Sequence, residues 1–154
     1  VPALTGLGAP YWDMYARGTI VGLTRGSNSN HIIRAALESI AFQTEDLLDA
    51  MRTEVKEPIP ALRVDGGASN NDFLMQFQAD ISNIDVERCE TAETTALGAA
   101  FLAGLTSGFW QDRTELRKLR HVRDTFHPEM QSHCRNEQKR LWRKAVQCAM
   151  RWAK

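Results

Sequence analysis

The stretch RVDGGASNNDFLMQFQAD, residues 63–80, carries the strongest structural signal in the sequence. A short apolar segment ends at Asp65, two glycines and two asparagines follow, and an amphipathic run comes after them. This order predicts a strand, a tight turn and a helix. Because glycine has no Cβ, Gly66 and Gly67 allow a ligand to approach the main chain closely.

The chemistry of this turn allows two interpretations. The first turn of a helix offers unpaired N–H groups, and Asn71 beside it carries one acceptor and two donors, which suit the edge of a base or a ribose hydroxyl. Alternatively, Asp-Gly-Gly and Asn-Asn are turn formers for purely conformational reasons. The pattern is neither a Walker A loop nor a GxGxxG turn. For Asp65, a cap or turn role is favoured over that of a general base.

The rest of the chain predicts strands that alternate with helices. The expected elements are a loop over 1–17, a strand over 18–26, a helix over 31–54, a strand over 61–65, a helix that opens after the turn, a strand over 85–90, a helix over 93–110, a polar connector, and a helix over 129–153. This alternation indicates an α/β fold with a mixed or parallel sheet packed with helices. We expect no internal domain boundary within 1–154.

Apolar spacing supports the helices. In the first, apolar residues recur with a period near 3.6, the segment SNSN precedes them, and two prolines end the pattern; the apolar positions are 33, 37, 40, 41, 47, 48 and 51. In the helix 93–110, small residues favour close packing against a neighbour; they are Gly98, Ala99, Ala100, Ala103 and Gly104. The last helix carries one apolar stripe, formed by Trp142, Val146, Ala149 and Ala153.

Composition places the chain among folded globular proteins. It has 154 residues, of which 43% are hydrophobic and 25% charged, so disorder of the whole chain is excluded. No apolar stretch reaches the roughly 18 residues that a membrane span needs. The cysteines are odd in number and form no CxxC pair, which favours a reducing compartment and a cytoplasmic location; they are Cys89, Cys134 and Cys148. Because the first residue is Val1, we expect the chain to start within a longer protein.

Charge is distributed unevenly along the chain. Residues 111–154 carry 12 Lys and Arg against 5 Asp and Glu, whereas residues 1–110 carry 7 against 14. We interpret the basic segment as a helical face docked beside an acidic neighbour, and we expect no nucleic-acid or membrane partner. A binding module that uses residues 135–154 to hold an acidic protein or nucleic acid is the alternative.

A second alternative is a structural metal site in the C-terminal part. The candidate ligands are His121, His127, His133 and Cys134. Six-residue steps turn by about 240° around a helix, so the three histidines would not share one face. Only His133 and Cys134 are placed to act together, and we therefore expect no metal site.

Several further motifs occur in one register. They are GTIVGL at 18–23 followed after seven residues by HIIRAALE at 31–38, TGLGAPYWD at 5–13, LESIAFQTEDLLDAM at 37–51, and ETTALGAAFLAG at 93–104. Together with the turn at 63–71, they resemble the C-terminal part of the FGGY carbohydrate kinases. The resemblance runs from Val1 to about Trp110, and RLWRKAVQCAMRW at 140–152 is similar to the last helix of that family.

The resemblance implies an actin-like, ribonuclease-H-like ATPase fold with two lobes around a cleft, of which residues 1–154 form part of the second lobe. It also implies transfer of the γ-phosphoryl group of ATP, with Mg²⁺, to a polyol. The loop at 5–13 and the closeness of the match point to glycerol as the substrate and glycerol 3-phosphate as the product. A xylulose or gluconate kinase is the alternative.

By the same resemblance, the turn lines the adenosine pocket through Gly66, Gly67, Ala68 and Asn71. Gly67 is expected to contact the nucleotide through its backbone and Asn71 through its side-chain amide. The chain departs from the family pattern at Asp72, whose charge would weaken the binding of a polyphosphate if it pointed inward. No catalytic residue is expected in this chain, because the catalytic base and most of the glycerol site lie in upstream parts of the family.

Two expectations about assembly follow. Without the N-terminal lobe as its partner, the chain has one wall of the cleft and is not expected to phosphorylate glycerol. Only three strands are predicted for four helices, so an apolar face or a sheet edge should be uncovered. We therefore expect self-association, and a homo-oligomer in the whole enzyme.

Overall fold

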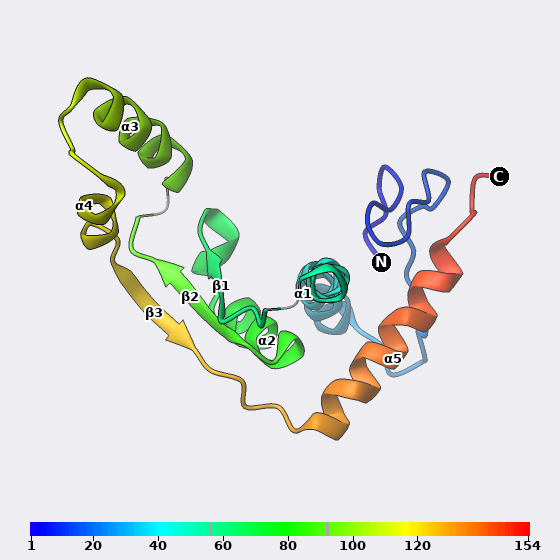
Figure 1. Ribbon diagram of the computed structural model, residues 1–154. Helices are drawn as coiled ribbons and strands as arrows, with labels where there is room; N and C mark the ends of the chain where they lie inside the picture. The colour runs from blue at the N-terminus through cyan, green and yellow to red at the C-terminus, as the bar shows by residue number, and fades with distance from the viewer. Residues whose placement is uncertain (56, 92) are drawn as a thin grey trace.

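The computed structural model describes residues 1–55, 57–91 and 93–154. Its elements are α1 (Ser29–Glu54), β1 (Ala61–Val64), the 3₁₀ helix η1 (Gly67–Asn70), α2 (Asp72–Ser82), β2 (Asp85–Cys89), α3 (Thr94–Ser107), α4 (Arg113–Lys118), β3 (Val122–Phe126) and α5 (Ser132–Ala149). They follow an open arc, with α3 and α4 at one end and the N-terminal segment beside α5 at the other (Figure 1).

The sheet is mixed, as the alternation of elements predicts. Its order is β1-β2-β3, with β1 parallel to β2 and β2 antiparallel to β3. The register between β2 and β3 shifts once, because Arg88 pairs with Asp124 whereas Cys89 pairs with Val122. Arg123 is therefore an extra residue on β3, which makes the irregularity a β-bulge.

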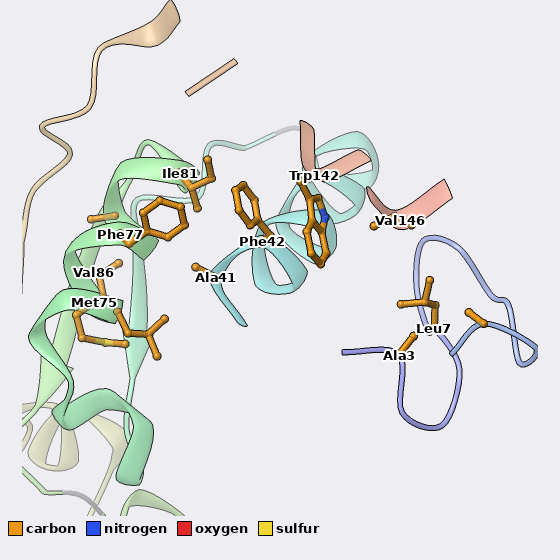
Figure 2. Close-up of a cluster of buried hydrophobic side chains, with 13 residues drawn as sticks. Ala3, Leu7, Ala41, Phe42, Met75, Phe77, Ile81, Val86, Trp142 and Val146 are labelled. Atoms are coloured by element: carbon orange, nitrogen blue, oxygen red, sulfur yellow. The ribbon is translucent and has the colours of Figure 1, made fainter. Parts of the chain in front are cut away.

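The core lies where α2 meets α1 and α5. Phe42 of α1 stands between Phe77 of α2 and Trp142 of α5 (Figure 2). Its ring meets Phe77 edge-on at 5.4 Å and stacks on Trp142 at 5.1 Å. On the other side, α2 packs on the sheet, where Val86 is fully buried. The core therefore joins the sheet to α5 through α2 and α1.

The first helix forms as predicted, but four of the seven positions of its apolar stripe are exposed. Asn28 caps α1 by accepting a hydrogen bond from the His31 amide, and the helix ends at Glu54 before the two prolines. However, Ile33 and Ile40 are 59% and 44% exposed, so the contact of α1 with α2 leaves these two side chains uncovered by the described residues. The buried face of the helix consists of Ser39, Ala41, Phe42, Glu45 and Leu48.

The predicted strand over 18–26 is wrong. Residues 18–23 have no strand assignment, and among the described residues the only backbone pairing of this run joins Thr19 to Val1. Ile20 and Leu23 are 64% and 58% exposed. A β-branched run favours extended backbone, but a strand also needs a neighbouring strand to complete its hydrogen bonds. No described segment takes that place.

Two elements occur in the region that was predicted to be a polar connector. These are α4, which Asp112 caps by accepting from two backbone amides, and the edge strand β3. The C-terminal helix is shorter than predicted, since α5 ends at Ala149 and Arg151 has a positive φ of 56°. Ala153 consequently lies outside the helix and is exposed.

The helix after β2 is present, but its small residues do not pack on a neighbouring element. It ends at Ser107, where Gly108 adopts the left-handed conformation typical of a helix C-terminus. Ala99 and Ala100 are exposed, and Gly104 is buried against the ring of Trp110. Among the described residues, the close packing of α3 is therefore the contact of Gly104 with Trp110, which follows the helix in the chain. No described helix is long and apolar enough to cross a membrane.

Candidate functional site

The turn at 66–71 lies at the carboxyl end of the parallel strands. Because β1 and β2 run in the same direction, both end at one edge of the sheet, and α2 and α3 begin there. In α/β proteins, ligands bind in the crevice outside the carboxyl ends of such strands. The position of the turn therefore fits a ligand site.

Two glycines give the turn its shape and leave its surface open. Gly66 has φ 79° and ψ 177°, a backbone conformation that favours glycine. Its carbonyl accepts hydrogen bonds from the amide and the hydroxyl of Ser69, at 3.2 and 2.7 Å. A Cβ atom added at Gly67 would meet no atom within 4 Å beyond the adjoining residues of the turn. A flat group thus has room to approach the backbone at this point.

The oxygen and the nitrogen of the Asn71 side-chain amide differ in their hydrogen bonding. Its Oδ1 accepts a hydrogen bond from the amide of Leu74 at 3.0 Å and so caps α2. Its Nδ2 donates no hydrogen bond to any described residue. The cap therefore orients the side chain and leaves its donor unused by the described residues, while contact of Asn71 with a ligand stays a prediction.

Asp65 links the end of β1 to the start of α3. Its carboxylate accepts a hydrogen bond from the hydroxyl of Thr94, the first residue of α3. This contact ties the start of α3 to the end of β1. It is made to a side-chain hydroxyl and not to the backbone, so the turn or cap role of Asp65 stays a prediction.

The charge of Asp72 is compensated within the chain. Its Oδ1 lies 2.7 Å from a guanidinium nitrogen of Arg88, a side chain that is 6% exposed. The expected repulsion of a polyphosphate is therefore reduced. Sequence reasoning did not identify Arg88, although an arginine at an inward-facing position of a short strand is a signal for a buried polar role.

The basic C-terminal helix docks on acidic residues, as predicted. Lys139 lies 2.7 Å from Glu45 and 2.8 Å from Asp49, both on α1. The indole of Trp142 donates to Asp46 at 2.7 Å, while burial raises the pKa of Asp46 above its ordinary value of 3.8. Of the cations that the binding-module alternative would use, these contacts pair Lys139 with acidic residues of α1.

The candidate metal ligands do not converge. His133 and Cys134 lie 3.2 Å apart on the surface, and His127 pairs with Asp85 at 2.9 Å. Among residues 1–55, 57–91 and 93–154, no group of three or more metal-ligating side chains is found. The three cysteines are all free thiols.

Two surface cavities lie away from the turn, beside α1 and α5. One of about 250 Å³ is lined by residues that include Glu45, Arg52 and Lys139. The other, of about 460 Å³, is bordered by Tyr11 and Arg143. Neither is lined by residues 65–72.

Comparison with known proteins gives one consistent family. A model of the C-terminal domain of the FGGY family of carbohydrate kinases matches residues 1–107. Glycerol kinase from Haemophilus influenzae is 58% identical over all 154 residues, and that from Caldanaerobacter subterraneus subsp. tengcongensis is 59% identical over 153 residues. The chain spans 31% of the length of each of these relatives.

Solved structures agree. Glycerol kinase of Plasmodium falciparum, crystallised with ADP, superimposes with a TM-score of 0.87 at 39% identity, covering 97% of this chain and 30% of that one. Gluconate kinase of Lactobacillus acidophilus gives a TM-score of 0.72 at 29% identity, over 96% and 29% of the two chains. The fold of these residues is thus that of the C-terminal part of such kinases.

Proposed function

The chain belongs to the FGGY family of carbohydrate kinases, and on that premise we propose that it is the C-terminal part of a glycerol kinase. The observation that carries the proposal is the identity of 58% with a glycerol kinase over every residue of the chain. The whole protein would transfer the γ-phosphoryl group of ATP to a terminal hydroxyl of glycerol. Residues 1–154 would belong to its second lobe, without an internal boundary, in a cytoplasmic enzyme.

The part of this chain in that reaction is to bind and orient the adenosine of ATP. Gly66, Gly67 and Ala68 would form the shelf on which the nucleotide lies, and the Nδ2 group of Asn71 would donate to it. The open space above Gly67 and the unused donor of Asn71 support this assignment. Phosphoryl transfer relies on groups placed on both sides of the transferred phosphate, so orientation of one half of the nucleotide is a partial contribution.

Magnesium would enter with the phosphates of ATP, whose charge it neutralises. No set of three ligating side chains is present in the described part of the chain, so we assign no residue here to the metal. The exposed apolar residues Ile20, Ile33 and Leu102 fit a chain that is covered by the remaining part of the kinase or by copies of itself. Monomeric behaviour at high concentration in light scattering would contradict self-association of the chain.

The test is calorimetric titration of ADP and ATP, with Mg²⁺, into the purified chain and into two variants of Asn71. Asn71→Asp and Asn71→Ser both keep an oxygen that can cap α2, but both remove the amide donor. We expect the unchanged chain to bind ADP and both variants to bind it more weakly. Asn136→Ala, at an exposed position of α5, is the matched control and should bind ADP as the unchanged chain does.

The possible results distinguish the loss of a nucleotide contact from the loss of the α2 cap. Equal ADP affinity in the unchanged chain and both Asn71 variants would exclude Asn71 as a contact. A folded chain that binds no ADP would contradict an adenosine shelf formed by these residues. Turnover of glycerol by the purified chain would refute the proposal that it contributes binding without catalysis.

A second candidate is a kinase for another polyol. It is favoured by the structural similarity to gluconate and xylulose kinases, with TM-scores of 0.72 and 0.70. Both values are lower than the 0.87 found with a glycerol kinase. Assays of the whole enzyme with glycerol, gluconate and xylulose would distinguish the two candidates.

A further inference from the structure

Arg88 is a charged residue in a position that alternation assigns to the core. In β2, Val86 and Arg88 face α2 and are buried, with exposed fractions of 0% and 5%. A buried guanidinium is tolerated when its donors are paired, and leaving it unpaired is costly. The partners that Arg88 has acquired therefore indicate what it does.

The guanidinium group of Arg88 donates hydrogen bonds to three elements, β3, η1 and α2. Its Nε and Nη2 atoms donate to Oδ2 of Asp124 on β3, at 2.8 and 2.6 Å. Its Nη1 donates to the carbonyl of Ser69 in η1, at 2.8 Å, and to Oδ1 of Asp72 in α2, at 2.7 Å. The guanidinium also lies 5.1 Å from the centre of the Phe126 ring, at the distance of a cation–π contact.

Two of these partners flank the proposed nucleotide contact. Ser69 and Asp72 stand on either side of Asn71, so Nη1 of Arg88 holds the backbone before it and the side chain after it. Ser69 in turn donates from its amide and hydroxyl to the carbonyl of Gly66. A continuous set of hydrogen bonds thus runs from Arg88 to the first glycine of the turn.

We propose that Arg88 is a positioning residue that holds the turn 66–71 in the shape that receives adenosine. The proposal rests on the proposed function, and Arg88 itself reaches the ligand only through the turn. Lysine would not replace it, because a single ammonium group cannot present the planar set of donors that reaches Asp124 on one side and Ser69 and Asp72 on the other.

The first measurement is amide hydrogen exchange over residues 66–75, which needs no ligand. We expect exchange to rise on the order of tenfold in Arg88→Lys, less in Asp72→Asn, and not at all over α5. Arg63→Lys is the matched control, since Arg63 belongs to the same sheet but its side chain is 63% exposed and it pairs with Glu87. Asp72 is 75% exposed, so Asp72→Asn keeps the test valid if Arg88→Lys does not fold.

The second measurement is the affinity of each folded variant for ADP. We expect Arg88→Lys to bind ADP on the order of tenfold more weakly, a loss comparable with that of supporting residues at metal sites. A purely structural role would alter exchange and leave the affinity of the folded molecules unchanged, and that result would overturn the proposal. Unchanged exchange over 66–75 in both Arg88→Lys and Asp72→Asn would overturn it as well.

The two measurements also separate this proposal from the proposed function. If the unchanged chain binds no ADP, the proposed function fails for this chain, and the exchange data alone decide whether Arg88 orders the turn. If ADP binds but Arg88→Lys changes neither exchange nor affinity, the proposed function stands and the positioning role fails.

Discussion

Two segments begin at the same edge of the sheet, and they differ in how far they are buried and hydrogen-bonded to the rest of the chain. The turn and α2, which follow β1, are fixed by a capping asparagine, a buried arginine and the aromatic core. The helix α3, which follows β2, is the more apolar of the two, yet Leu102 on it is 70% exposed. The difference shows that apolar composition predicts a need for burial, whereas stability comes only from the burial that is achieved.

The largest expected contrast is between apolar truncations in the two segments. Phe77→Ala in α2 removes a side chain that is 5% exposed and should lower the free energy of unfolding by about 3–5 kcal/mol. Leu102→Ala in α3 should change it by less than about 0.5 kcal/mol. Urea denaturation of both variants checks the prediction. A loss above about 2 kcal/mol in Leu102→Ala would show that α3 is buried in solution.

The next contrast concerns the ionic attachment of α5 to α1. Lys139→Met leaves Glu45, whose side chain is 3% exposed, with one cationic partner fewer. We expect a loss of about 2 kcal/mol, below the usual range for a broken buried pair because Arg52 still binds Glu45 at 2.8 Å. Lys144→Met, at an exposed position of the same helix, is the control. Equal unfolding midpoints for the two variants would contradict the role assigned to Lys139.

A smaller contrast lies in the caps of the two helices. Asn71→Ala removes the side-chain cap of α2 and should cost about 1 kcal/mol. Glu93 occupies the corresponding position of α3 but makes no capping hydrogen bond, so Glu93→Ala should cost almost nothing. Thermal unfolding, with Asn71→Asp as the variant that keeps the cap, checks the pair. A loss of stability in Asn71→Asp as large as in Asn71→Ala would rule out capping as the cause.

The smallest effect is a dependence on pH that is confined to the anchored segment. Hydrogen bonds from Arg123 and Arg88 lower the pKa of Asp124 below its ordinary value of 3.8. A carboxylate with a lowered pKa stabilises the folded state above pH 3.8, and that contribution is lost as the pH falls through the folded-state pKa. Protection of the amides of residues 66–75 against exchange, taken relative to the intrinsic rate at each pH, should therefore fall on acidification more in the unchanged chain than in Asp124→Asn. An equal loss of protection in both would show that Asp124 does not cause the pH dependence.

The elements that local patterns predict are those whose partners are close in sequence. The helix 31–54 was predictable from its period and from Asn28, and the turn after β1 from its glycines and Asn71. By contrast, β3 reads VRDTF, in which charged residues mask the alternation, and it is a strand because it pairs with β2. The strand predicted over 18–26 is wrong for the opposite reason. Its composition suits a strand, but no described segment pairs with it.

The candidate site divides in the same way. Gly66, Gly67 and Asn71 are recognisable in the sequence because a turn is a local structure. Arg88 is 17 residues further along the chain than Asn71, and its role depends on the register between β2 and β3 and on the packing of α2. Those long-range relations are fixed by tertiary structure. The residue that supports the turn could therefore be identified only from the three-dimensional structure.

The bulge at Arg123 has a consequence for how the chain tolerates insertions and deletions. One residue of β3 is absorbed there without a partner, immediately before the Asp124 that pairs with Arg88. A change of one residue in the connection from α4 can therefore be taken up by forming or removing the bulge, while the pairing of Arg88 with Asp124 is preserved. Length variation among homologues should accordingly gather before Asp124 and be rare between Asp124 and Phe126.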